Sequence, residues 1–300
     1  MNSFDEIPDS IISEMEEQFA EQEWQRQLEE KREEIDDIPI NLIIDTNWWI
    51  YLTQEENIKF LKLITEKLNK GEFRILVPEL VIKEWENNLQ QTKHSAQNSI
   101  KNQAKNANKI GKYLDEPEKS QLDKILKKYK TEEDKRLTIV QETIDTIESI
   151  IKSKSVIIPI SDKTKNKVIE FGILKKAPFQ TKNSTADAII FFSAMEYLEE
   201  NTDPEVSDSI FISYNSNDFS KSSLSKQDKD TIHPDLEPFL KRTNTIYERN
   251  LAKALKLTVE MQQTIEGYLD YKAESALEDD YIEAQVDMWI THQNEIARGK

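Results

Sequence analysis

Four acidic residues lie where strand-like runs end or helix-like runs begin, and α/β folds place their ligands at such points. One acid directly follows the apolar run 41–44, and another lies in a helix-like segment after the run 73–77. A third falls in the first turns of a helix-like run, and the fourth follows the strand-like run 209–214. These acids are Asp45, Glu84, Asp187 and Asp218. Together they could hold a divalent metal ion for phosphodiester hydrolysis.

Phosphodiester hydrolysis at neutral pH needs a nucleophilic water and neutralisation of the charge on the reacting phosphate. Mg²⁺ or Mn²⁺ supplies both, and such hard cations prefer oxygen ligands while keeping several waters. Clustered carboxylates repel one another and are poor structural material without a cation. We therefore expect the four acids to be catalytic metal ligands, direct or through water. For any single acid, a helix cap or a turn is the alternative.

Two asparagines and three lysines are candidates for substrate binding. Asn47 and Asn215 lie near Asp45 and Asp218, where an amide could bind an acid or the substrate, or only cap a helix. Lys175, Lys176 and Lys182 precede Asp187 and could contact phosphate groups.

Tryptophans and a histidine near the motifs have two interpretations each. Trp48, Trp49 and Trp85 adjoin acids and could stack on unpaired bases, but such residues more often belong to a core. His233 has only Asp235 as a nearby acid in sequence, so we expect it to be structural.

Composition excludes several classes of protein. The 300 residues include no cysteine, which excludes disulfides and thiolate chemistry, and only three histidines, far apart, which argues against zinc. Five glycines without a phosphate-binding loop argue against most nucleotide-binding folds. Apolar runs are shorter than the roughly 20 residues that span a bilayer, and no signal-peptide pattern is present. We expect a soluble, cytoplasmic protein that does not engage the membrane.

The net charge of -17 is concentrated at the two ends of the chain. Residues 1–38 carry 14 acidic and 3 basic side chains, and residues 270–300 carry 8 and 3. Between them, residues 152–182 carry 8 lysines against 2 acids, and residues 93–136 carry 12 basic against 7 acidic groups. Basic segments around an acidic centre suit RNA binding, although lysine-rich helices can also be simply solvated faces.

Short apolar runs alternate with helix-like segments, which predicts an α/β fold with a parallel sheet flanked by helices. Strands are expected at 41–45, 73–77, 156–160, 209–214 and 243–247. Helices are expected at 9–34, 56–70, 78–110, 118–129, 131–153, 162–171, 185–198, 250–271 and 274–295. Gly71 is placed just past the end of one helix and Gly111 at the end of another.

The motif segments resemble those of the PIN-domain ribonucleases, in particular a bacterial subgroup with a long helical insertion. The matching segments are NLIIDTN (41–47), VPELVIKEW (77–85), KNSTADAIIF (182–191), IFISYNSNDF (210–219) and HPDL (233–236). Ser184-Thr185-Ala186 departs from the glycine-containing turn of many relatives, which affects the expected loop geometry before Asp187. The resemblance covers about residues 40 to 250.

The sequence pattern and the resemblance together predict three regions, and the resemblance implies a function. We expect an acidic helical extension at 1–38, a PIN-like nuclease domain at 39–250 with a helical insertion at about 87–153, and C-terminal helices at 251–300. The implied activity is that of a Mg²⁺- or Mn²⁺-dependent endoribonuclease acting on RNA, as a toxin or defence effector. Two alternatives are a non-catalytic PIN-like scaffold that binds a protein, and a single-strand or flap DNA nuclease.

The N-terminal helix carries Ile12, Met15 and Phe19 at helical spacing among charged residues. Three roles are compatible with this pattern. The helix could cover the lysine-rich groove in place of RNA, it could bind a protein partner or a second copy, or it could be a solvated helix without a further role.

Overall fold

A computed structural model describes residues 9–35, 38–180, 184–222 and 225–297 of the chain. The chain separates into two compact units, residues 39–261 and residues 1–38 together with 262–300. The larger unit contains the sheet, and the smaller one is built from two helices.

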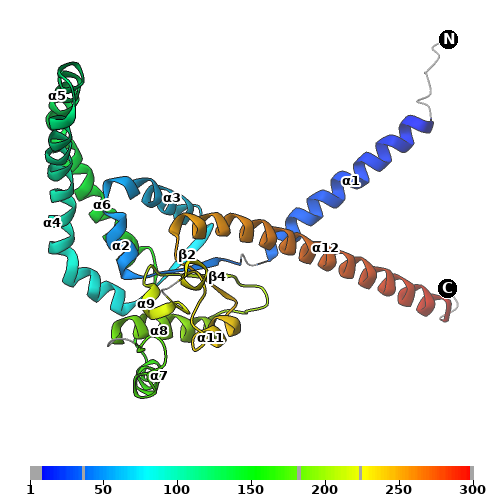
Figure 1. Ribbon diagram of the computed structural model, residues 1–300. Coiled ribbons are helices and arrows are strands. Elements are labelled where there is room, and N and C mark those ends of the chain that lie inside the picture. Colours follow the sequence, from blue (N-terminus) through cyan, green and yellow to red (C-terminus); the bar gives the residue numbers. More distant parts are fainter. Residues whose placement is uncertain (1–8, 36–37, 181–183, 223–224, 298–300) are drawn as a thin grey trace, which may run out of the picture. The chain divides into compact units, whose positions relative to one another are not determined.

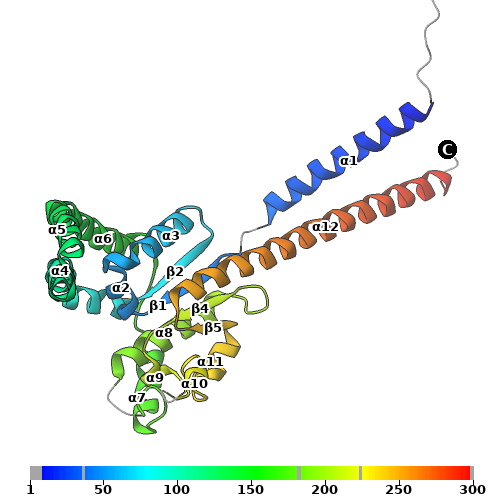
Figure 2. The ribbon, with the colours of Figure 1, turned by 45° about the horizontal axis from the view of Figure 1, so that its top comes forward.

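The larger unit is built on a five-stranded parallel sheet, which confirms the expected α/β class (Figures 1 and 2). The strands are β1 (Ile40–Ile44), β2 (Phe73–Pro78), β3 (Val156–Ile158), β4 (Ser209–Ile212) and β5 (Thr245–Glu248). Their order is β3-β2-β1-β4-β5. Every residue of β1 and β4 is buried, as expected for strands with helices over both faces of the sheet.

Between β1 and β2 the chain forms α2 (Thr46–Leu52), the 3₁₀ turn Glu55–Asn57 and α3 (Ile58–Asn69). Gly71 follows α3 with φ +75°, a conformation that a residue with a Cβ rarely adopts. Its N–H binds the carbonyl of Leu68, and the next N–H binds the carbonyl of Lys67. The predicted helix end at Gly71 is therefore confirmed.

The helical insertion between β2 and β3 consists of α4 (Glu79–Ile110), a 3₁₀ turn at Gly111–Tyr113, α5 (Glu116–Thr131) and α6 (Glu133–Ser153). These helices pack on one another and lie side by side in both views (Figures 1 and 2). The helix predicted at 118–129 begins earlier, because Asp115 and Glu118 form a reciprocal capping box. Our predicted start was wrong by two residues.

Two further helices precede β4, and three lie between β4 and β5. They are α7 (Asp162–Ile173), α8 (Thr185–Asn201), α9 (Ser216–Phe219), α10 (Lys226–Lys229) and α11 (Glu237–Arg242). An aromatic cluster fills the space between α8, α9 and the sheet. Phe211 of β4 lies at its centre, with ring centroids 5.3 Å from Phe191, 5.0 Å from Phe219 and 6.3 Å from Tyr247.

The last helix, α12 (Leu251–Ala297), corrects our expectation of two C-terminal helices at 250–271 and 274–295. The intervening sequence Tyr271-Lys272-Ala273-Glu274 contains neither glycine nor proline, so nothing in it ends a helix. Within the described part of the chain, no helix combines the length and apolar character needed to cross a membrane.

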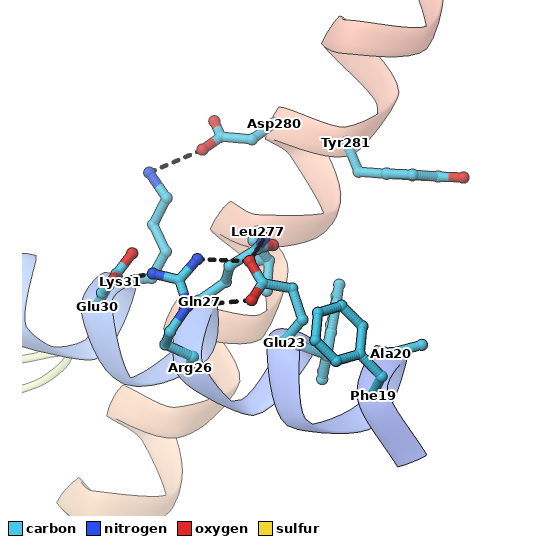
Figure 3. Close-up of a pocket in the computed structure, with 11 residues that line it drawn as sticks. Phe19, Ala20, Glu23, Arg26, Gln27, Glu30, Lys31, Leu277, Asp280 and Tyr281 are labelled. Carbon is cyan, nitrogen blue, oxygen red and sulfur yellow. Dashed lines mark hydrogen bonds and ion pairs between the residues drawn. The ribbon is translucent and has the colours of Figure 1, made fainter. Parts of the chain in front are cut away.

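The smaller unit pairs α1 (Asp9–Glu34) with α12 from Gln262 onward. Lys31 binds Asp280 at 2.7 Å, and Arg32 lies 3.6 Å from Asp270. A hollow of about 1020 Å³ lies between the two helices, and Figure 3 shows side chains that line it. Phe19 lines this hollow and is 70% exposed, whereas the side chains of Ile12 and Met15 lie outside the described part.

The aromatic cluster predicts that Phe211→Ala strongly destabilises the larger unit. Phe211 is fully buried, and truncating such a ring costs about 3–5 kcal/mol of unfolding free energy. Urea unfolding measures the loss. The matched control is Tyr113→Ala, because Tyr113 is 90% exposed and should change stability little. Equal effects of the two substitutions would contradict this account of the core.

Candidate active site

The carboxyl ends of β1 and β4 lie side by side at the centre of the sheet. Ile44 pairs with Ile212, and the N–H of Asp45 donates to the carbonyl of Ile212 at 3.0 Å. From β1 the chain proceeds outward to β2 and β3, and it later returns to the other side of β1 to form β4 and β5. A parallel sheet opens a crevice at such a switch point. Residues that directly follow β1 and β4 therefore meet there.

Asp45 is the acid at this switch point, and its side chain is only 2% exposed. It occupies the cap position of α2, yet its carboxylate makes no capping hydrogen bond. Instead Oδ2 accepts hydrogen bonds from Ser213 Oγ at 2.8 Å and from Asn47 Nδ2 at 3.4 Å. Burial raises the pKa of Asp45, and these hydrogen bonds oppose the rise. The side chains of Ser213 and Asn47 thus orient this carboxylate.

Glu84 is brought toward Asp45 by the first turns of α4, which begins after Pro78. The half-buried Glu84 carboxylate accepts a hydrogen bond from Thr46 Oγ1 at 2.6 Å. Burial raises the pKa of Glu84, and the negative charge of Asp45 raises it further. Among the described residues, no lysine, arginine or histidine forms an ion pair with either acid.

Asp187 and Asp218 are linked through one amide. Asn215 Nδ2 donates to Asp187 Oδ1 at 3.2 Å and also to Asp218 Oδ2. Asp187 lies in the first turn of α8 and is half-buried, whereas Asp218 lies in α9 and is fully buried. Asp218 also accepts a hydrogen bond from Ser184 Oγ at 2.9 Å.

Ser213 connects these two halves of the site. Its hydroxyl donates to Asp45 and accepts a hydrogen bond from the backbone N–H of Asn215 at 3.1 Å. The segment after β4 thus links the acid after β1 to the acids of α8 and α9. Asp45, Asp187 and Asp218 thus belong to one hydrogen-bonded network. Glu84 lies close enough to this network for the negative charge of Asp45 to raise its pKa.

Two hydroxyl groups that hold site acids were not predicted from the sequence. Ser184 was noted only as a departure from a glycine-containing turn, but its hydroxyl holds Asp218 rather than capping α8. Thr46 was part of a motif without an assigned role, and it holds Glu84. Thr46 directly follows Asp45 in the sequence, and this position next to a site acid was a signal for its role. Asp218 is 34 residues from Ser184, so sequence proximity offered no signal there.

The predicted substrate-binding residues fall into three groups. Asn47 and Asn215 lie within the network described above, and Asn47 is exposed. Lys175 and Lys176 lie exposed after α7, and no described hydrogen bond or ion pair joins them to the four acids. Lys182 lies outside the described residues.

The flanking tryptophans and His233 have mainly structural environments. Trp49 and Trp85 are fully buried, and Trp49 Nε1 donates to the carbonyl of Ile44 at 3.1 Å. His233 Nδ1 accepts the N–H of Asp235, whose carboxylate accepts the N–H of Ala177 at 3.0 Å. These bonds fix the loop after α7, in agreement with a structural role for His233.

The chemistry of the donors fits a hard divalent cation. Asp45 and Glu84 offer carboxylate oxygens, feel one another's charge and have no described cationic partner, so a bound cation would relieve their repulsion. In the described ranges, however, no three acidic or histidine side chains converge in metal-ligating geometry. The structure therefore places the four acids in two pairs rather than in one gathered cluster.

Comparison with known proteins identifies one family. The family model described as PIN domain matches residues 42–219, which is more than half of the chain and includes all four acids. No curated protein and no solved structure was found to match the chain.

Burial of Asp45 predicts a pH-dependent effect of Asp45→Asn on the metal-free protein. Burial raises the pKa of Asp45 in the folded state, so the folded protein holds this proton more tightly than the unfolded chain does. The stability that this proton gives to the folded protein is therefore lost as the pH rises through the folded-state pKa. Asparagine stays neutral, so Asp45→Asn should raise the Tm in EDTA at neutral pH. The gain should shrink as the pH falls toward the ordinary aspartate range near 4.

Thermal melts across this pH range provide the measurement. Asp123→Asn is the matched control, because Asp123 is exposed on α5 and far from the site in the chain. A Tm difference between parent and Asp45→Asn that does not vary with pH would contradict the assignment.

Proposed function

Because the chain belongs to the PIN-domain family, whose members are in general metal-dependent nucleases, we propose that it is an endoribonuclease that hydrolyses RNA phosphodiester bonds. The observation that carries this proposal is the hydrogen-bonded connection from Asp45 through Ser213 and Asn215 to Asp187 and Asp218. It supports a common role for acids that are far apart in the sequence. The basic segments 93–136 and 152–182 suit a phosphate backbone as ligand.

In this proposal Asp45 and Glu84 would hold Mg²⁺ or Mn²⁺. Asp187, which Asn215 orients through a hydrogen bond, would be a further metal ligand. When bound there, such an ion would supply a lowered pKa for a water ligand and neutralise charge on the phosphate. Ser213 and Thr46 fix the carboxylates of Asp45 and Glu84 through neutral hydroxyl donors, which leaves the negative charge of both acids available. Such fixed orientation is what a catalytic ion requires of its ligands.

Asp218 has a different role in this proposal because it is fully buried. Its two oxygens accept hydrogen bonds from Ser184 and Asn215. We assign it the task of holding the Asn215 amide, which in turn orients Asp187. Asp218 is thus a positioning residue.

Metal-dependent RNA cleavage should be abolished by EDTA and by Asp45→Asn, Glu84→Gln or Asp187→Asn. Ser213→Ala should reduce cleavage by about 10–100-fold, the usual effect of removing a group that orients a metal ligand. The measurement is cleavage of a pool of structured RNAs by purified protein with Mg²⁺ or Mn²⁺, beside single-stranded and flap DNA.

A matched control for Glu84→Gln is Glu86→Gln, two residues further along α4. Glu86 is exposed and pairs with Lys152 at 2.8 Å, so this substitution should leave cleavage unchanged. Cleavage by Asp45→Asn at the parent rate would refute the assignment. Cleavage of DNA but not of RNA would keep the site and change the substrate.

Metal binding should also stabilise the fold. A cation that binds only the folded state raises the Tm by mass action, so Mg²⁺ or Mn²⁺ should increase the Tm of the parent protein. Asp187→Asn should shrink this increase, whereas Asp123→Asn should preserve it. Thermal melts with and without each cation measure the shift. The same metal-induced shift in the parent and in Asp187→Asn would show that the ions bind elsewhere.

A further inference from the structure

Three aromatic rings are grouped beside the candidate active site. Tyr51 of α2 and Tyr214, which follows β4, are 54% and 61% exposed. Trp48 of α2 is half-buried and contacts both tyrosines edge-on, with ring centroids 5.8 Å from Tyr51 and 6.0 Å from Tyr214. The two tyrosine rings are nearly parallel, at an angle of 21° and a centroid distance of 6.3 Å. Trp48 therefore fixes two exposed rings in similar orientations.

The backbone ties this aromatic group to the acids. Trp48 N–H donates to the carbonyl of Asp45 at 3.0 Å. Tyr214 lies between Ser213, which binds Asp45, and Asn215, which binds Asp187 and Asp218. The exposed rings are thus next to the residues that would act on a phosphate.

A cationic side chain, Arg249, lies next to this aromatic group. The Arg249 guanidinium carbon lies 5.5 Å from the centre of the Tyr214 ring, and Arg249 is held by Asp230 at 3.1 Å. A planar guanidinium can itself stack on a base and attract the phosphate backbone. In contrast, the exposed Tyr113 makes no ring contact with another described residue. At this edge, two exposed tyrosines thus lie in ring contact with each other, and a cation adjoins one of them.

We propose that Tyr51 and Tyr214, supported by Trp48, form a stacking platform for an unpaired base of single-stranded RNA. This inference rests on the proposed function and specifies its substrate class. Every base presents a π-face to an aromatic ring, so stacking tolerates many sequences. A continuous duplex hides these faces within its own stack. The platform therefore selects unpaired nucleotides next to the cleaved phosphate.

The test measures the binding of a fluorescent oligoadenylate and of a blunt-ended, fully paired RNA duplex by anisotropy, with Mg²⁺. All proteins carry Asp187→Asn so that the RNA remains intact. The double substitution Tyr51→Ala/Tyr214→Ala should weaken oligoadenylate binding by about tenfold or more, the loss expected for a base–aromatic stack. Duplex binding should change much less. Tyr51→Phe/Tyr214→Phe keeps both rings and should restore the affinity for oligoadenylate.

Tyr113→Ala is the matched control for loss of an exposed tyrosine, and thermal melts verify that each variant folds. If an alanine pair fails to fold, Tyr51→Leu/Tyr214→Leu replaces it, since leucine keeps apolar volume without a ring. Unchanged oligoadenylate affinity in the alanine or leucine double variant, here called the ring-less protein, overturns the proposed platform. An equal loss for oligoadenylate and duplex also overturns it.

These outcomes are separate from failure of the proposed function. If ring-dependent binding of oligoadenylate occurs but the parent protein with Asp187 intact cleaves no RNA, the platform stands and the nuclease assignment falls. If the parent cleaves RNA and the ring-less protein binds oligoadenylate as tightly as the ring-containing one, the nuclease assignment stands and the platform falls.

Discussion

The hydrogen bond from Ser213 to Asp45 joins the ends of two strands that the chain forms 168 residues apart. It exists because β4 pairs directly with β1 in parallel register, so both strands end at the same edge of the sheet. Everything proposed for the site depends on this adjacency. Asn215 follows Ser213, and through it Asp187 and Asp218 are oriented toward the same edge. A sheet with another strand order would separate these residues.

Neutral donors hold the acids that we assign to the metal ion. Asp45 accepts hydrogen bonds from a serine and an asparagine, and Glu84 accepts one from a threonine. A hydroxyl or an amide fixes the direction of a carboxylate without cancelling its charge. The raised pKa values of Asp45 and Glu84 record the cost of this arrangement in the absence of a cation. A structural role alone gives no reason for that cost.

Much of the fold follows from local sequence signals. Apolar runs located all five strands, and Gly71 marked a helix end because its left-handed conformation suits glycine. The acids were found because the ends of parallel strands share one edge. The role of Ser184 was not predictable, since it depends on the position of a residue far along the chain. The single long α12 was predicted as two helices, although residues 271–274 contain neither glycine nor proline to end the first one.

The most direct test of a shared metal site is a crystal structure of the full chain with Mn²⁺, located by its anomalous scattering. The account predicts an anomalous peak within coordination distance of the carboxylates of Asp45 and Glu84, on the side that faces Asp187. Oxygen ligands for such an ion lie at about 2.0–2.6 Å. No peak beside Asp45 in a crystal saturated with Mn²⁺, or a peak only among the acidic terminal helices, would contradict the account.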